Sequence, residues 1–166
     1  RVDILHPGPG VGGHCIAVDP WFIVSKTPDE SRLIHTARQV NNRKPQWVID
    51  KVKLAVAEFL QVNPNKTAKD LIIACYGLAF KADIDDLRES PALAISVAIA
   101  DFHSGLTMVI EPNINELPSS LNMELVTFDV ACAQADIAVL LVDHQEFRVS
   151  GAPDIEIIID TKGIWR

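Results

Sequence analysis

Apolar residues recur at helical spacing between residues 30 and 60. The recurring positions are Leu33, Ala37, Val40, Val48, Val52, Ala55 and Phe59. Spacings of three and four residues predict an amphipathic helix that begins near Thr27 or Asp29 and ends near Leu60. Pro45 interrupts the pattern, so we expect the helix to be kinked or restarted there. The apolar face of such a helix requires a partner surface.

Short apolar runs replace this pattern beyond the polar segment 61–70, which predicts a linker. The runs that predict strands are 71–77, 106–112, 124–128, 137–143 and 155–160. Segments 90–105 and 129–136 have helical character, the first with Ser90 as its cap, Pro91 at its first position and a glycine at its end. Strands that alternate with helices predict an α/β fold, with a doubly wound parallel sheet covered on both faces.

Charge and composition narrow the possible partners. The chain has 166 residues, a net charge of −7 and no basic cluster, which argues against a nucleic acid partner. No apolar run approaches the roughly 18–20 residues of a membrane helix and the first residues lack signal-peptide character, so we predict a cytoplasmic protein without a membrane partner. The three cysteines are widely spaced and not arranged as CxxC, which predicts neither a disulfide framework nor a zinc site.

The turn behind the first predicted strand reads YGLAFKADIDDLRESP, at the edge where doubly wound sheets bind nucleotides. Its one glycine matches neither a dinucleotide fingerprint nor a P-loop. Lys81 and Arg88 lie in this turn, and Arg88 precedes the next predicted helix, whose dipole attracts anions. These two residues predict a diphosphate site. Alternatively, both cations pair with neighbouring acidic side chains on a solvated surface.

Cys15 ends a glycine- and proline-rich stretch, HPGPGVGGHC, and Asp19 follows at the start of a run, 19–24, that predicts a short strand or turn. Three roles are open for this thiol: a buried structural residue, a metal ligand with His14 and Asp19, or a nucleophile. Adjacent ligands give poor metal geometry, so no metal is expected. A flexible loop whose amides stabilise negative charge favours the nucleophile, with Asp19 as general base or positioning water.

The sequence alone assigns no definite role to any of the five histidines. His14 beside the cysteine keeps an open role: if protonated it would lower the pKa of the thiol, whereas a lone histidine is more often just a hydrogen-bonded side chain. The others, His6, His35, His103 and His144, have no evident partner in the sequence.

Five motifs spread over the chain resemble the second half of the UDP-glucose/GDP-mannose 6-dehydrogenase family. They read GPGVGGHCIAVDP, ARQVNNRKP, GLAFKADIDDLRESPA, VDHQEF and IDTKGIW. The resemblance implies an enzyme of three parts: an amino-terminal Rossmann domain for NAD, a central helical region that forms a homodimer, and a carboxy-terminal Rossmann-like domain for the UDP of a UDP-sugar. It divides this chain into a cysteine loop with central helix, 1–62, and a Rossmann-like UDP-sugar-binding domain, 63–166.

The glycine-rich loop stands at the very start of the chain, so we expect residues to be missing upstream. On the family's plan, the missing part is the domain that binds most of the NAD. We therefore expect the chain by itself to be inactive.

The resemblance also assigns roles to single residues. It implies that Cys15 is the nucleophile and that Asp19 assists the water or proton steps. The family oxidises the alcohol at the sixth carbon of the sugar to a carboxylate in two NAD-dependent steps, through a thiohemiacetal and a thioester on the cysteine. The implied substrate contacts are Gly10, Gly12, Gly13, Phe80, Lys81, Lys162 and Arg1, and the implied cofactor contact is Arg88.

The substrate expectation depends on two positions beside the cysteine. His14 precedes it, and Val18 stands where glucose-type members have a lysine. Both resemble the branch that acts on UDP-N-acetyl-D-mannosamine for surface polysaccharide synthesis. The alternatives are a UDP-glucose or UDP-N-acetylglucosamine 6-dehydrogenase, or a non-catalytic module that binds UDP and dimerises.

Overall fold

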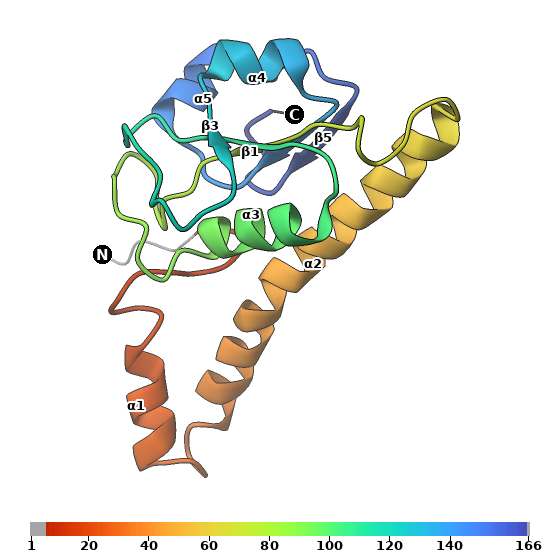
Figure 1. Cartoon of the computed structure of the whole chain (residues 1–166). Coiled ribbons are helices and arrows are strands. Elements are labelled where there is room, and N and C mark those ends of the chain that lie inside the picture. Colours follow the sequence, from red (N-terminus) through yellow and green to blue (C-terminus); the bar gives the residue numbers. More distant parts are fainter. Residues whose placement is uncertain (1–5, 166) are drawn as a thin grey trace.

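The computed structural model describes residues 6–165, and these contain a parallel sheet of five strands in the order β3-β2-β1-β4-β5 (Figure 1). The strands are β1 (Ile73–Tyr76), β2 (Thr107–Ile110), β3 (Glu124–Leu125), β4 (Ile137–Leu140) and β5 (Ile157–Asp160). The chain runs outward from β1 to β3 and then returns to the other side of β1. This reversal places a topological switch point between β1 and β4. The predicted Rossmann-like, doubly wound α/β fold is confirmed.

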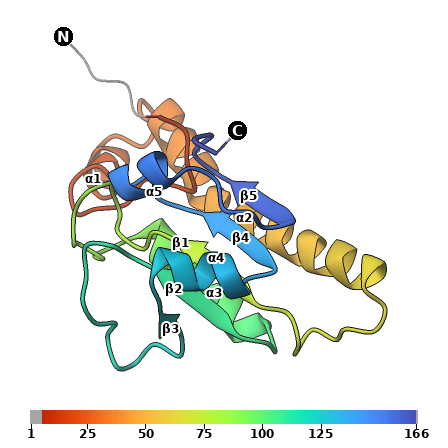
Figure 2. The same cartoon turned by 90° about the horizontal axis from the view of Figure 1, so that it is seen from above.

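Side chains of β1 alternate between two cores. Ile73 and Cys75 pack on the side of helices α2 (Arg32–Val62) and α3 (Pro91–Phe102). Ala74 and Tyr76 pack in the second core, which includes residues of α4 (Phe128–Gln134) and α5 (Gln145–Ser150). Figures 1 and 2 show these two helix layers on opposite sides of the sheet. Because both faces are covered, β1, β2 and β4 are buried along their whole length.

The start of the chain differs from the sequence prediction. Residues 19–24 form no strand but most of helix α1 (Asp19–Lys26). Pro20 lies in the first turn of this helix, where its missing N–H removes no hydrogen bond, and Asp19 complements the helix dipole. The predicted strand or turn is therefore wrong, since a six-residue apolar run has no period that separates the two structures.

Helix α2 begins later than predicted and is not restarted. Its cap is Ser31, because residues 27–31 form a turn in which the Ser31 N–H donates to the Thr27 carbonyl. The helix continues through Pro45 to Val62. Val48 follows Pro45 by less than one turn and is fully buried, so packing against the sheet stabilises the helix beyond the proline.

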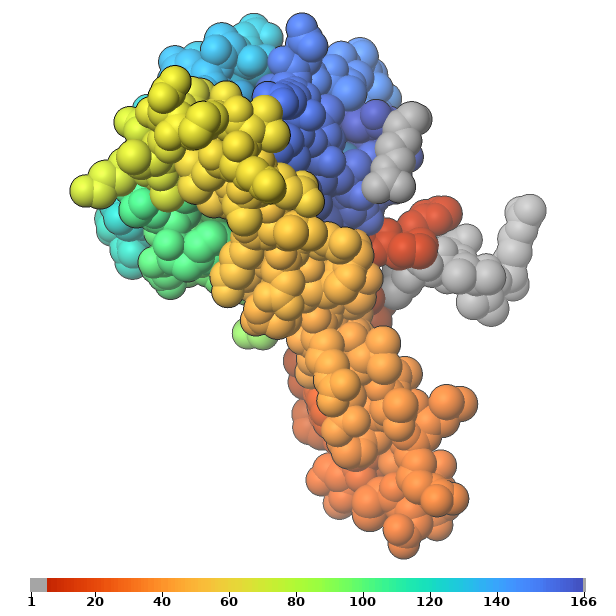
Figure 3. All heavy atoms as spheres, turned by 90° about the vertical axis from the view of Figure 1, so that its right-hand side faces the viewer, coloured from red at the N-terminus to blue at the C-terminus, as the bar shows by residue number. Residues whose placement is uncertain are grey.

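The two halves of α2 have different surroundings. All four of its buried residues lie beyond Pro45 and join the core shared with α3: Val48, Val52, Ala55 and Phe59. The first half and α1 form an arm that projects from the rest of the molecule (Figure 3), and α1 has no buried residue. The predicted domain boundary at 62/63 stays a prediction, while residues 48–59 pack with the sheet.

Ser90 joins the start of α3 to the end of β1. Its Oγ accepts from the Leu93 N–H at 3.2 Å and donates to the Leu78 carbonyl at 2.6 Å. The predicted cap, with Pro91 at the first position, is confirmed. We expect Ser90→Ala to lower the free energy of unfolding by about 1–2 kcal/mol, because it removes a buried cap and a buried hydrogen bond.

Urea denaturation of the chain measures this loss, with Thr127→Ala as the control. Thr127 caps α4 through one exposed contact of 3.4 Å, so its loss is expected to stay below about 1 kcal/mol. Equal losses for the two variants would show that the hydrogen bond to Leu78 contributes nothing.

Candidate functional site

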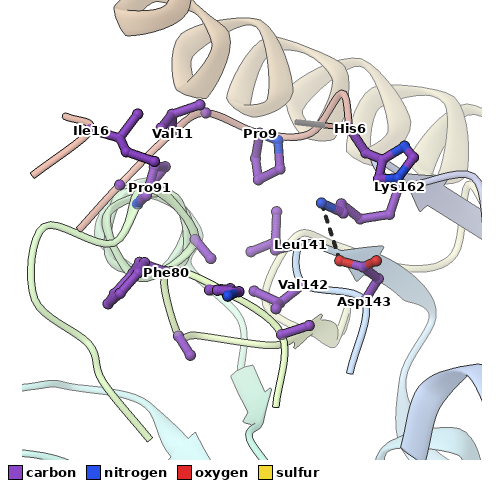
Figure 4. A pocket seen from close by; sticks show the side chains of 16 residues that line it. His6, Pro9, Val11, Ile16, Phe80, Pro91, Leu141, Val142, Asp143 and Lys162 are labelled. Carbon is purple, nitrogen blue, oxygen red and sulfur yellow. Dashed lines mark ion pairs between the residues drawn. The ribbon is translucent and has the colours of Figure 1, made fainter. Parts of the chain in front are cut away.

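A pocket of about 290 Å³ lies at the carboxyl ends of β1, β4 and β5, beside the switch point (Figure 4). The glycine-rich loop 6–16 forms one wall, and the segment that follows β1 in the chain forms another. Its lining includes Gly10, Gly12, Phe80, Lys81, Asp143 and Lys162. The structure thus brings five of the predicted substrate contacts to one cavity.

The glycine-rich loop packs closely against Phe80 and the turn that precedes α3. A Cβ on Gly12 would meet the Glu89 carbonyl oxygen at 2.4 Å, and a Cβ on Gly13, whose φ is +81°, would meet the Phe80 ring at 2.9 Å. The Val11 N–H donates to Asn41 Oδ1 of α2 at 3.1 Å. Close packing therefore requires glycine at both positions. Contact with a sugar stays a prediction, and Gly13 is not part of the pocket lining.

Cys15 and Asp19 follow the glycine-rich loop and are both exposed. The Cys15 carbonyl accepts from the N–H groups of Val18 and Asp19, which forms the turn between the loop and α1. Ile16 lines the pocket, whereas Cys15 itself does not. Cys15 therefore adjoins a pocket residue in the chain, and the Asp19 N–H joins it through a backbone hydrogen bond at the start of the arm.

The three cysteines, all within the described residues, differ in access. Cys75 is buried in β1, where burial raises the pKa of its thiol to about 12, and Cys132 is half-buried. Cys15 is exposed, so a buried structural role for this thiol does not apply. The nucleophilic role stays a prediction that the exposure allows.

The cations predicted to bind phosphate have different environments. The Arg88 guanidinium donates to both carboxylate oxygens of Asp86 at 2.6–3.0 Å, and these hydrogen bonds lower the pKa of Asp86 to about 2. The alternative prediction of a solvated ion pair therefore describes Arg88. Within residues 6–165, Lys81 has no such ion pair and lines the pocket. Arg1 lies outside the described residues.

Lys162 is fixed at the opposite side of the pocket. Its Nζ lies 3.1 Å from Asp143 Oδ1, and Asp143 also pairs with Arg148 (Figure 4 shows the first pair). Burial alone would raise the pKa of Asp143, but the hydrogen bond and charge of Lys162 outweigh it and lower that pKa. The carboxylate is thus ionised at neutral pH and holds the ammonium group at the pocket wall.

Sequence reasoning missed a buried pair behind the pocket. His144, fully buried, lies 3.0 Å through Nε2 from Glu111 Oε2, and Glu111 is 3% exposed. Burial opposes ionisation of Glu111, but hydrogen bonds from His144 and from the Leu78 and Ala79 amides lower its pKa. An available signal was the position of Glu111 directly after the second strand, where doubly wound folds carry a functional acidic residue.

Two further structural findings concern the described part of the chain. No group of three or more His, Cys, Asp or Glu side chains in residues 6–165 is arranged to hold a metal ion. Among the helices of that range, none combines the length and the apolar character that a bilayer crossing needs.

Comparison with known proteins connects this geometry to a family. The model of the UDP-glucose/GDP-mannose dehydrogenase family, UDP binding domain, matches residues 74–166, and the model of its central domain matches residues 1–43. The UDP-N-acetyl-D-mannosamine dehydrogenase of Yersinia pestis is 60% identical over 171 residues, which cover 100% of this chain and 40% of that protein. The NDP-N-acetyl-D-galactosaminuronic acid dehydrogenase of Ralstonia nicotianae is 51% identical over 168 residues, with 99% and 38% covered.

A solved structure agrees with these matches. The UDP-D-ManNAc dehydrogenase of Pyrococcus horikoshii superposes with a TM-score of 0.74 at 29% identity, covering 100% of this chain and 38% of that one. This chain spans about 40% of the length of the curated relatives it matches. The family resemblance of the five motifs is confirmed: the chain belongs to the UDP-glucose/GDP-mannose dehydrogenase family, with a UDP-binding domain at 74–166 and a central-domain segment at 1–43.

Proposed function

We propose that this chain supplies the cysteine loop and the UDP-sugar site of an NAD-dependent UDP-N-acetyl-D-mannosamine 6-dehydrogenase. The observation that carries the proposal is the pocket between the glycine-rich loop and the carboxyl edge of the sheet, with Lys81 and Lys162 in its walls. The 60% identity to an enzyme of that name supports this sugar over glucose.

The pocket suits a nucleoside diphosphate attached to a sugar. Two ammonium groups at one cavity, one of them fixed by Asp143, offer charge to a diphosphate. A second hollow, which shares His6, Asp143 and Lys162 with the pocket, extends it over residues 160–164. The ligand can therefore lie along the sheet edge, with its sugar end toward Ile16 and the adjacent Cys15.

NAD does not fit the turn behind β1 in this chain. The Leu78 and Ala79 amides, which begin that turn, both donate to Glu111 Oε2 and are not free to hold a phosphate. We therefore place the cofactor on a domain outside this chain, with Arg88 on the side that faces it. Bound there, NAD would supply the acceptor for the two hydrides of the oxidation.

Cys15 does the covalent part of the proposed reaction. Its sulfur adds to the aldehyde carbon formed by the first oxidation, and the resulting thiohemiacetal loses a second hydride to become a thioester. Water, deprotonated or positioned by Asp19, then attacks the thioester carbonyl, which releases the carboxylate and the free thiol. We also infer a cytoplasmic location, where a free thiol such as Cys15 stays reduced.

The test uses an enzyme that joins this chain to an NAD-binding domain of its family. We expect UDP-N-acetyl-D-mannosamine to be oxidised with two NAD reduced per sugar, and faster than UDP-glucose or UDP-N-acetylglucosamine. A faster reaction with either of those sugars would overturn the substrate assignment. UDP binding without any NAD reduction would instead favour the alternative that the chain is a non-catalytic UDP-binding module.

We also propose that the arm forms a homodimer with a second copy. Helix α1 has no buried residue, and large apolar side chains are exposed on it, just before it and on the first half of α2. They include Ile16, Phe22, Ile23, Leu33 and Val40. An apolar surface of this kind on a projecting arm is typical of an interface between subunits.

The double variant Phe22→Asp with Leu33→Glu is expected to be monomeric at concentrations where the parent chain is dimeric. These side chains are 66% and 82% exposed, so the change should leave the fold intact. Sedimentation velocity at several concentrations measures the effect. Val149→Asp, at a 76% exposed site on α5, is the matched control and should remain dimeric. A parent chain that is monomeric throughout would refute the interface.

A further inference from the structure

Three residues of the pocket wall, 80–82, lie between two buried anchor points. Before them, Leu78 and Ala79 bind Glu111, and after them the Asp83 amide binds His144. Lys81 and Asp83 are exposed, whereas Phe80 lies against Gly13 and Ala82 packs against the core. The Phe80 N–H also donates to the Asp86 carbonyl at 3.1 Å. The two anchors add to these contacts and fix both ends of the segment.

Glu111 forms the first anchor from the end of β2. Its Oε2 accepts from the Leu78 and Ala79 amides at 2.7 and 3.0 Å, and its Oε1 accepts from the Asn113 amide at 3.2 Å. The carboxylate thus saturates amides that would otherwise point into the turn behind β1. Removal of this acceptor would leave two buried N–H groups unsatisfied.

His144 forms the second anchor and couples it to the first. Its Nδ1 lies 2.9 Å from the Asp83 nitrogen, and a backbone N–H can only donate, so Nδ1 is the acceptor. The neutral ring then carries its proton on Nε2 and donates to Glu111. Asp83 has a φ of +62°, a strained conformation for a residue with a side chain, which fixed partners on both sides maintain. Its carboxylate accepts from the Gln145 N–H at 2.8 Å.

We infer that Glu111 and His144 are positioning residues for Phe80 and Lys81, and so set the affinity of the pocket for a nucleoside diphosphate. The inference rests on the proposed function, because it assumes that Lys81 contacts the ligand. Neither residue reaches the ligand itself. They act by holding the segment between Ala79 and Asp83 in one conformation before the ligand arrives, which reduces the ordering cost of binding.

Two substitutions of His144 separate the anchors. His144→Gln keeps a donor near the Nε2 position but removes the acceptor for the Asp83 amide, whereas His144→Asn keeps an acceptor near Nδ1 but removes the donor to Glu111. Calorimetric titration of each 166-residue variant with UDP, below its unfolding temperature, measures the affinity. We expect His144→Gln to weaken UDP binding about tenfold and His144→Asn by about threefold or less, the scale of one hydrogen bond lost or kept.

His103→Gln is the matched control. His103 is also buried, but its Nε2 bonds to the Leu71 carbonyl at the other edge of the sheet. This variant should lose thermal stability and retain the UDP affinity of the parent chain. If His144→Gln also retained the parent affinity, the inference would be wrong although the proposed function stood. If the parent chain bound no UDP, the proposed function would fail first.

Hydrogen exchange covers the case in which the His144 variants do not fold. In the parent chain the Asp83 amide is expected to exchange slowly for a residue in an exposed turn, and more slowly still with UDP bound. Rapid exchange with and without UDP would overturn the inference.

Discussion

Replacement of Cys15 by serine is expected to lower uronate formation by about a thousandfold or more in an enzyme that contains this chain and an NAD-binding domain. The estimate follows from nucleophile removal in enzymes whose catalytic groups act as one unit. A serine hydroxyl stays protonated at neutral pH and is therefore a much weaker nucleophile than a thiolate. The measurement is uronate released per enzyme under saturating substrate, together with NAD reduced.

The control for this variant is Cys132→Ser. Cys132 is half-buried on α4, on the opposite side of the sheet from α2 and the arm, so its substitution should leave the rate within about twofold of the parent, an effect typical of sites remote from the chemistry. Cys15→Ser should leave UDP affinity unchanged, because the thiol is not part of the pocket lining. A Cys15→Ser enzyme with the parent rate would show that Cys15 is not a covalent nucleophile in this reaction.

Replacement of Gly12 by alanine is expected to weaken UDP-sugar binding by about a hundredfold. The added Cβ would lie 2.4 Å from the Glu89 carbonyl oxygen and 2.7 Å from Pro91 Cδ, both held in the tight turn that starts α3. The loop or the turn must therefore shift, and because Gly12 and Pro91 both line the pocket, the shift changes the pocket wall. Overpacking of this kind costs about 1–3 kcal/mol, and 2.7 kcal/mol corresponds to a hundredfold change.

Gly151→Ala separates this effect from general strain. Gly151 has a φ of +74° and no atom within 4 Å of a built Cβ, so alanine there strains the backbone without any contact near the pocket. This variant is expected to unfold at a lower temperature and to bind UDP-sugar like the parent chain. Similar affinities for the Gly12 and Gly151 variants would show that the loop does not form the binding wall.

The sheet was predictable because its signal is local. Each of the runs such as 71–77 and 137–143 contains the strand that the structure has, since residues buried on both faces leave an unbroken apolar run. Of the short helices, α4 was predicted at 129–136, whereas α1 and α5 were not. Residues 19–24 and α5 are too short to show a helical period, and their structure depends on a proline in the first turn and on burial of Phe147.

Site residues were predictable where the family motifs carry them and not where partners come from distant segments. Four of the five motifs contribute residues to the pocket walls, and the fifth, ARQVNNRKP, lies on α2. His144 and Glu111, in contrast, are 33 positions apart and meet only because β2 and β4 flank β1 in the sheet. The pairing of Arg88 with Asp86, two positions away, was among the open alternatives, and only geometry separated it from Lys81.

The most direct test of the central claim is calorimetric titration of the 166-residue chain with UDP, compared with its Lys81→Ala and Lys69→Ala variants. Lys69 is an exposed lysine before β1, at the sheet edge opposite the pocket. We expect the parent chain and Lys69→Ala to bind UDP equally and Lys81→Ala to bind about tenfold more weakly, as loss of a charged hydrogen bond predicts. No binding by the parent chain, or equal binding by all three, would contradict a UDP site in this pocket.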